Sequence, residues 1–318
     1  MTTSRRLLAL ATSLGLAVLL TAPATPVSAR TVGDRCQGSG PVARSAIPTL
    51  NAAGCALAGR TVTVGRVSVV VPPAGMGVVG DGVGRHGDVR GFTVTNTGSS
   101  VRIVRGSNAS AAAVAGDPPA CKDKTFHLEG NKWASSLKYH VNVGGLPGRL
   151  HAKAVIRAVK AGNQNMRKGH NNCHKPRLKT PASHYLGRTH VKPNIKVHGP
   201  SCGKPNTTNV VGFANLPGGL LGWTCYWIYV KSGRIAGADI VMDNGKYLVT
   251  KLPKTCRAKW DLEGAVTHEW GHAYGMAHTG SGHGNLTMQH ELAPCSTYAR
   301  TLGLGDWLGM NKMYGHRK

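Results

Sequence analysis

The chain has 318 residues, 41% of them hydrophobic, which suffices for one large domain or two modest ones with a real core. Aromatic residues make up only 5% and glycine contributes 43 residues, so the composition favours a loop-rich or β-rich body over a helix bundle. The formal net charge of +26 favours acidic polymers or anionic surfaces as partners. The sequence contains no recognised nucleic-acid-binding motif, so no specific nucleic-acid partner is expected, and we expect a monomer.

Residues 1–29 are typical of a signal peptide. Arg5 and Arg6 form a basic start, Leu7–Leu20 is an apolar run, and Val27–Ala29 offers a small-residue cleavage site. The apolar run is shorter than the about 20 residues that a transmembrane helix needs, and no later segment is long and apolar enough. We therefore expect a secreted, extracellular protein without a transmembrane segment.

The cysteines all follow the predicted signal peptide. An even number of cysteines in an exported chain predicts about four disulfides, whose connectivity the sequence leaves open. Two cysteines precede residue 110 and six follow it, so each part could close its own bridges. The absence of a CxxC pair argues against a cysteine-based zinc or redox site. The eight positions are Cys36, Cys55, Cys121, Cys173, Cys202, Cys225, Cys256 and Cys295.

Residues 30–105 are rich in glycine, valine and threonine and predict a small β-rich domain. Strands are expected at Arg60–Val71, Gly91–Asn96 and Ser100–Val104. This segment contains no group of residues with the spacing of a catalytic site. It is either a propeptide or a retained module. Residues 106–119 have small side chains and predict a linker.

Residues 120–318 predict an α+β domain. Residues 162–208 are basic and rich in histidine and proline, which predicts an irregular excursion pinned by disulfides. Strands and helices are expected on both sides of it. The expected strands are Ser136–Val143, Gly222–Val230 and Ile235–Met242, and the expected helices are His151–Ala161, Asp261–Tyr274 (with Asp261 as N-cap) and Gly303–Tyr314.

The stretch from His268 to His278 has the spacing of a catalytic metal site. On a helix, residues four apart share a face, so His268 and His272 can offer ring nitrogens to one ion. Gly275 permits a left-handed turn, after which His278 can return as a third ligand. Three protein ligands leave a fourth position open, as catalytic zinc requires, and Glu269 can reach a water there.

This stretch, HEWGHAYGMAH, resembles the HExxHxxGxxH signature of the metzincin zinc metallopeptidases. Met288 stands ten residues beyond His278 and matches the methionine turn of that family. Ile235–Val241 resembles the GxIxxADI stretch of matrixin-like members, and Leu302–Gly315 resembles their terminal helix. The resemblance covers roughly residues 130–315. It implies a metzincin-like catalytic domain: a twisted mixed sheet with an antiparallel edge strand, an active-site helix and a C-terminal helix.

The resemblance implies a secreted zinc endopeptidase that binds one catalytic Zn²⁺ through the three histidines. Glu269 would be the general base for a zinc-activated water. A protein or peptide substrate would lie extended along the edge strand and pair with its backbone. The expected edge-strand residues are Ile235, Ala236, Gly237, Ala238, Asp239, Ile240, Val241 and Met242.

His290 stands two residues beyond Met288. Astacin-like and serralysin-like metzincins carry tyrosine at that offset, where it reaches the zinc or the oxyanion of the reaction. An imidazole can also donate a hydrogen bond to developing negative charge, so His290 is a candidate catalytic residue. It could instead cap a turn or face solvent, and His283 is an equally near competitor.

Other residues in the sequence partly match a cysteine switch, a calcium site or a second zinc site. Cys202, in PSCGKPN, looks like a propeptide cysteine switch, but its position and the even cysteine count favour a disulfide. Asp239 and Asp243 offer too few carboxylates for calcium, so calcium is not expected. Five histidines match no zinc spacing and predict a solvated basic loop rather than a second zinc site. They are His170, His174, His184, His190 and His198.

A second class of function stays open. The chain could be a cationic protein that binds the cell envelope and uses the metzincin fold as an inactive scaffold. The presence of Glu269 argues against this alternative, because a mere scaffold has no need of a general base.

Overall fold

The computed structural model describes residues 42–43, 49–51, 57–64, 67–86, 91–105, 116–197 and 201–317. The predicted signal peptide, Cys36, Cys55 and residues 106–115 of the predicted linker lie outside these ranges. Within them, none of the helices combines the length and the apolar character needed to cross a bilayer.

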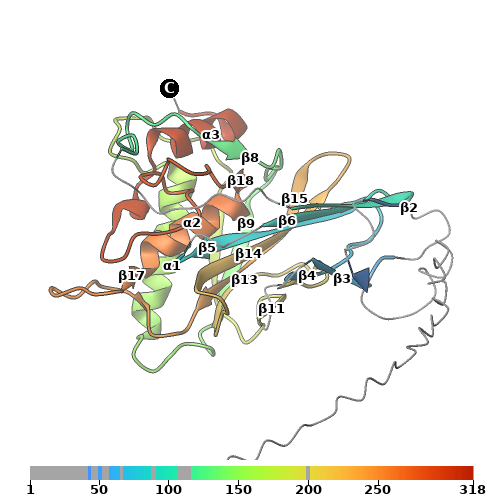
Figure 1. Cartoon of the computed structure of the whole chain (residues 1–318), viewed down its shortest axis with the longest axis horizontal. Helices are drawn as coiled ribbons and strands as arrows, with labels where there is room; N and C mark the ends of the chain where they lie inside the picture. The colour runs from blue at the N-terminus through green and yellow to red at the C-terminus, as the bar shows by residue number, and fades with distance from the viewer. Residues whose placement is uncertain are drawn as a thin grey trace, which may run out of the picture.

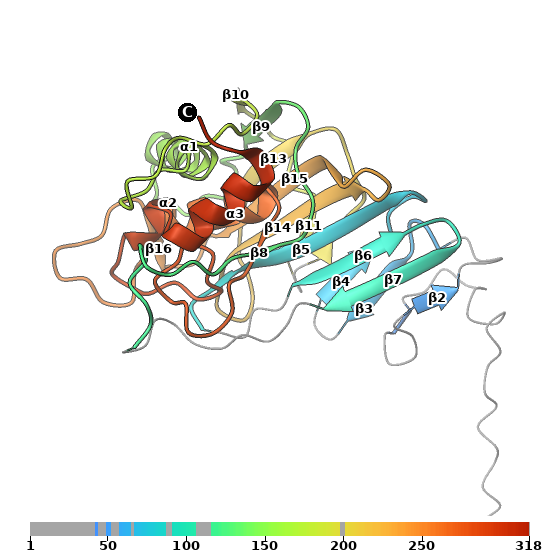
Figure 2. The same cartoon turned by 90° about the horizontal axis from the view of Figure 1, so that it is seen from above.

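The described residues form an α+β fold in three layers. Helices α1 (Ala152–Lys168), α2 (Leu262–Ala273) and α3 (Leu304–Tyr314) gather on one side of a large mixed sheet, toward one end of it (Figures 1 and 2). A smaller sheet covers part of the opposite face. A short 3-10 helix, η2 (Tyr298–Arg300), packs against α2.

The large sheet is part parallel and part antiparallel. Its first four strands, β10, β9, β13 and β15, are mutually parallel, and from β14 onward each strand is antiparallel to its neighbour. In spatial order the strands are β10 (Ser183–Arg188), β9 (Leu137–Val141), β13 (Asn209–Ala214), β15 (Arg234–Asp243), β14 (Leu220–Tyr229), β5 (Met76–Gly84), β6 (Phe92–Asn96), β7 (Ser100–Arg105) and β2 (Thr49–Asn51).

The remaining strands are short. Five of them make the smaller sheet, and two pairs lie near the helices. The smaller sheet runs β1 (Val42–Ala43), β3 (Thr61–Val64), β4 (Val67–Val70), β12 (Ser201–Cys202) and β11 (Ile195–Lys196); the pairs are β16 (Leu248–Val249) with β17 (Trp260–Asp261) and β18 (Met276–Ala277) with β8 (His127–Leu128).

Two apolar cores lie on opposite faces of the large sheet, because side chains of a strand alternate between its faces. Along β14, Tyr226 and Ile228 enter the core beneath the helices, whereas Trp223, Cys225 and Trp227 enter the core beneath the smaller sheet. A central strand buried on both sides carries few polar residues, which matches the composition of β14.

The N-terminal strands do not form the separate domain that the sequence predicted. β5 pairs with β14, so β5, β6 and β7 continue the sheet of the C-terminal part and share its cores. The strands near residues 92–105 were predicted correctly, but the single strand expected at Arg60–Val71 is the hairpin of β3 and β4. The glycine-rich β5 was missed, because glycine lowers the intrinsic preference for a strand.

The C-terminal elements agree with the sequence more closely. α2, α3, β9 and β14 lie where they were expected, and Asp261 caps α2. α1 begins as predicted but continues to Lys168, where Gly169 ends it with a left-handed φ of 67°. The following segment holds β10, β11 and β12 and is tied down by two disulfides, as expected for a pinned excursion.

The predicted edge strand is a central strand. Residues Ile235 to Met242 lie in β15, which pairs with β13 on one side and β14 on the other. Both rows of its backbone groups are therefore occupied, and a substrate cannot pair with them. The alternation of side chains predicts a strand but not its neighbours, which explains the error. The strand that runs antiparallel beside it is β14.

Three disulfides join the described cysteines: Cys121–Cys173, Cys202–Cys225 and Cys256–Cys295. No described cysteine is free. The six cysteines after residue 110 therefore close their own bridges, as their even number indicated. Because Cys202 is bonded to Cys225, it cannot act as a cysteine switch.

These pairings predict the result of peptide mapping without reduction. Each of the three linked peptides should be found, and alkylation before reduction should label none of the six cysteines. Replacing both Cys202 and Cys225 by alanine should lower the free energy of unfolding by about 3 kcal/mol, because the bond closes a loop with a sequence separation of 23. Alkylation of Cys202 in the unreduced protein would contradict the assignment.

Candidate metal centre

The helix that carries the motif is fixed at both ends. At its start the Asp261 carboxylate accepts a hydrogen bond from the backbone N–H of Gly264 at 2.7 Å, and the Arg300 guanidinium donates to the same carboxylate at 2.5 and 2.8 Å. At its end Gly275 adopts a φ of 98°. A side chain at Gly275 would collide with the carbonyl oxygen of Asn131, so both the turn and the close approach require glycine.

The turn at Gly275 brings His278 back to the two histidines of the helix. The Nε2 atoms of His268 and His272 are 2.9 Å apart, and the Nε2 atom of His278 lies 3.2 and 3.1 Å from them. An ion 2.0–2.1 Å from each nitrogen in a tetrahedral site separates the nitrogens by about 3.3 Å. The three histidines could therefore hold one metal ion, as the sequence predicted.

The outer nitrogen of each ring faces an oxygen acceptor. These contacts favour the tautomer in which Nδ1 carries the proton and Nε2 presents its lone pair to the centre. Three lone pairs that converge in a buried space repel one another unless a cation lies between them. The contacts are His268 Nδ1 with the Thr287 carbonyl at 2.7 Å, His272 Nδ1 with the Met276 carbonyl at 3.0 Å, and His278 Nδ1 with the Asp81 carboxylate at 3.4 Å.

Burial keeps the three rings neutral. It lowers the pKa of His272 to about 4, and it lowers the pKa of His268 and of His278 well below the usual value, with neighbouring histidines lowering both further. A metal binds only the neutral imidazole, so these pKa shifts favour metal over protons.

Glu269 lies beside His268 on α2 and is fully buried. Its Oε1 accepts a hydrogen bond from the backbone N–H of Val83 at 3.0 Å, and its Oε2 accepts one from the Thr224 hydroxyl at 2.5 Å. A Cβ atom at Gly222 would lie 2.5 Å from Oε1, so glycine there lets the carboxylate approach β14. Burial raises the pKa of Glu269 well above its usual range, and the two hydrogen bonds oppose that rise.

Met288 lies directly beneath the helix. A Cβ atom at Gly271 would collide with its sulfur, and the methionine is fully buried. The Asp306 carboxylate of α3 fixes this turn by accepting the backbone N–H groups of Met288 at 3.0 Å and Thr287 at 2.7 Å. The carbonyl of Thr287 in turn contacts His268. Asp306 thus orients a candidate ligand from a distance, a role that the sequence did not indicate.

Asp81 was also missed by the sequence analysis. It lies on β5 opposite Thr224 of β14, and its carboxylate contacts the ring of His278. Burial raises its pKa well above the usual range, whereas the hydrogen bond from the Gly82 N–H lowers it. Asp81 is a single carboxylate in a segment without other candidate site residues, so no pattern in the sequence marks it.

The two histidines that were candidates for a catalytic role, His290 and His283, lie in different surroundings. His290 is 1% exposed, its ring centroid lies 5.9 Å from that of His278, and neither of its ring nitrogens has a hydrogen-bond partner in the described structure. Burial lowers its pKa. His283 instead pairs with the Asp123 carboxylate at 2.8 Å. His290 is therefore the one that faces the candidate site.

The other predicted features lie outside this centre. Asp239 is buried in β15, where burial raises its pKa to about 7 and its oxygens accept the backbone N–H groups of Asn194 and Val210 at 2.7 and 2.8 Å. Asp243 accepts a backbone hydrogen bond from Leu216. Across the described ranges, no second cluster of three potential ligand side chains exists, so the histidines of the basic segment that are described do not form one.

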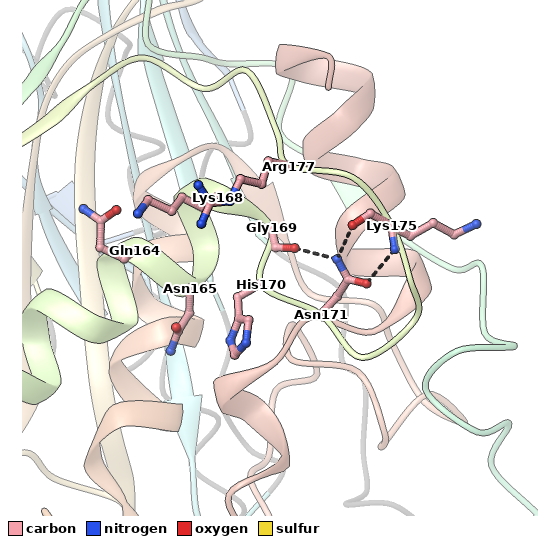
Figure 3. Close-up of a pocket in the computed structure, with 8 residues that line it drawn as sticks. All are labelled: Gln164, Asn165, Lys168, Gly169, His170, Asn171, Lys175 and Arg177. Carbon is pink, nitrogen blue, oxygen red and sulfur yellow. Dashed lines mark hydrogen bonds between the residues drawn. The ribbon is translucent and has the colours of Figure 1, made fainter. Parts of the chain in front are cut away.

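A hollow of about 350 Å³ lies at the C-terminal end of α1 (Figure 3). Asn171 shapes it by donating to the carbonyls of Gly169 at 2.6 Å and Lys175 at 3.2 Å. Its lining is basic and polar. The lining residues are Gln164, Asn165, Lys168, Gly169, His170, Asn171, Lys175 and Arg177.

Comparison with known proteins adds no assignment. No protein-family model matches the chain, and a search of curated proteins finds no significant match. Function is therefore inferred from the geometry of the candidate centre.

The geometry predicts one metal ion per chain. Protein loaded with zinc and dialysed should retain one equivalent, measured by mass spectrometry of the metal, and His272→Ala should lose it. The control is His151→Ala, because His151 is exposed and makes no side-chain cap. Since the pKa of His272 is lowered to about 4, zinc should stay bound as the pH falls through about 6.5 and leave nearer pH 4. Full zinc content in His272→Ala would contradict the site.

Proposed function

We propose that the chain is a secreted zinc metalloendopeptidase of the metzincin type. The observation that carries the proposal is the convergence of three imidazole Nε2 atoms within 3.2 Å of one another, with a buried glutamate on the same helix. A mixed sheet with an antiparallel strand, a helix bearing the motif and a closing helix are the coarse features that this class implies. Disulfides are compatible with export.

The reaction is the hydrolysis of a peptide bond. The water oxygen bonds to the carbonyl carbon, the C–N bond breaks, and a proton moves to the leaving nitrogen. Glu269 accepts the proton from water and returns it to that nitrogen. The Thr224 hydroxyl donates a hydrogen bond to Oε2 of Glu269 and so orients the carboxylate. Zinc held by the three histidines would supply a Lewis acid that polarises the peptide carbonyl.

Replacing Glu269 by glutamine tests this function. Glu269→Gln should keep its fold and its zinc but lose hydrolysis by about 10²–10⁴-fold, because amide cannot accept the proton. Cleavage of a peptide library is measured with and without a chelator, before and after limited proteolysis, since Glu269 is buried in the intact chain. Glu263→Gln, on the same helix but paired with Arg300, is the matched control. Unchanged activity in Glu269→Gln would contradict the proposed mechanism.

His290 is proposed as the donor to the oxygen that gains negative charge in the reaction. Its removal in His290→Ala should lower kcat by about 10²–10³-fold and leave zinc content unchanged. His283→Ala should stay within about twofold of the parent kcat, because His283 bonds to Asp123 instead. A His290→Ala variant with unchanged kcat would end this assignment, and a matching loss of zinc would make His290 a ligand.

The alternative is a cationic envelope-binding protein on an inactive scaffold. The basic hollow and the net charge of +26 favour it as a second candidate. Binding to an anionic polymer, with no hydrolysis by the zinc-loaded and proteolysed protein, would select this alternative. The presence and burial of Glu269 beside the three histidines favour the enzyme.

A further inference from the structure

The hollow at the C-terminal end of α1 lies on a part of the molecule that the proposed reaction does not use. Lys168 lies on the last turn of the helix, and Lys175 and Arg177 lie on the loop that follows it (Figure 3). No residue of the lining is acidic, and none belongs to the candidate metal centre. With a volume of about 350 Å³, the hollow is large enough for a small ligand.

These three cationic side chains have no acidic partner. Within the ranges that the structure describes, none of them takes part in an ion pair. Glu263 of α2 accepts a hydrogen bond from Asn165 of the lining at 3.0 Å, but it is also paired with Arg300 at 3.2 Å. Its charge is thus balanced by Arg300, and the hollow keeps its positive charge.

The end of α1 does not need these cations. Basic side chains near a helix end often bond to the carbonyl groups of the last turn, which lack partners within the helix. Here each of the last four carbonyls already has a donor, so Lys168 is free to bind a ligand. The pairs are His170 N–H with the Asn165 carbonyl at 2.8 Å, Gly169 N–H with Met166 at 3.1 Å, the Thr180 hydroxyl with Arg167 at 2.6 Å and Leu178 N–H with Lys168 at 3.1 Å.

Hydrogen bonds within the lining occupy acceptors and leave donors open. Oε1 of Gln164 accepts from the Arg167 guanidinium at 3.0 Å. Oδ1 of Asn171 accepts from the backbone N–H groups of Cys173 and Lys175, both at 3.0 Å. The amide nitrogen of Gln164 and the three cationic groups have no hydrogen-bond partner in the described ranges. Such a lining suits a ligand that accepts hydrogen bonds and carries negative charge.

The loop that forms the far wall of the hollow is fixed in place. Asn171 closes its turn with the hydrogen bonds given above, and Cys173 is bonded to Cys121. The carbonyl of Pro176 accepts a hydrogen bond from the Trp307 indole at 2.9 Å. A wall that is already ordered lowers the entropy lost on binding, which favours a binding site over a patch of solvated charge.

We propose that the hollow binds the phosphate monoester of a saccharide, with Lys168 and Arg177 as the main contacts. A phosphate monoester carries a charge of about −1.5 to −2 and three strong acceptor oxygens, whereas a carboxylate has two oxygens and a single charge. The planar guanidinium can hold two of the phosphate oxygens together, and the ammonium can bind the third. Of the two groups, the phosphate therefore matches a lining with several open donors.

The rest of the hollow indicates what carries the phosphate. Its volume corresponds to roughly ten water molecules, which is more than one phosphate ion fills. None of the lining residues has an apolar side chain, so an acyl chain or an aromatic ring would gain nothing there. The hydroxyl groups of a sugar can instead bond to polar surroundings. This inference does not depend on the proposed peptidase function.

The test is calorimetric titration of the full chain with glucose 6-phosphate, glucuronate, glucose and inorganic phosphate. Glucose 6-phosphate should bind at one site, and the other three probes should bind at least about 10-fold more weakly, since each lacks the phosphate or the sugar. The double variant Lys168→Gln, Arg177→Gln should weaken the binding of glucose 6-phosphate by about 10- to 100-fold, because it removes two charge-assisted contacts. Zinc content should stay unchanged in this variant.

The matched control is the double variant Lys251→Gln, Lys254→Gln, which removes the same charge. Both lysines are exposed, and they follow β16, whose Leu248 carbonyl accepts a hydrogen bond from Arg149 at 3.2 Å just before α1 begins. The 17 residues of α1, a length of about 25 Å, separate this end of the helix from the hollow. The control should bind glucose 6-phosphate within about twofold of the parent chain.

A third variant, Asn171→Ala, changes no charge but releases the turn of the loop, so it should also weaken binding, by about 10-fold. Binding of phosphorylated dextran would identify the phosphate of a glycan as the source, and binding of glucose 6-phosphate alone would identify a free sugar phosphate; either supports the site. An equal loss in both double variants would overturn the inference, because overall charge would then explain the binding. Equal affinity for glucuronate or for inorganic phosphate would overturn the assignment of a saccharide phosphate.

Discussion

The candidate centre depends on one requirement: each buried imidazole must have an acceptor for its outer N–H. Only then do all three inner nitrogens point at one place. The acceptors come from separate parts of the chain, namely the carbonyl of Thr287, the carbonyl of Met276 and the carboxylate of Asp81. Asp306 extends the arrangement to α3 by holding the Thr287 turn. Sheet, helices and turn are thus all needed to place three nitrogens.

The sequence predicted what is local. His268, His272 and His278 are close in the chain, so the geometry of a helix followed by a glycine turn was enough to bring them together. The cap at Asp261 and the helix at Gly303–Tyr314 also follow from neighbouring residues, and the structure has both. Met288, ten residues further on, lies under Gly271 as the spacing suggested.

The sequence could not predict what depends on pairing across the chain. Asp81 and Val83 contact the centre from a distant part of the chain. Val83, for example, is separated from its partner Glu269 by 186 positions in the sequence. The neighbours of a strand are decided by how both faces of the sheet pack. The alternation of side chains in Ile235–Met242 carries no information about those neighbours. For the same reason β15 was taken for an edge, and β5 was not recognised as a strand.

β14 has a further consequence for the solubility of the protein. If the row of backbone groups that pairs with β5, flanked by Trp223 and Trp227, were exposed, it would pair with the matching row of another copy. Ten residues of such an edge, in a strand without charged side chains, would make copies of the chain adhere to one another. Because β5 covers that edge, it also protects the folded protein against aggregation.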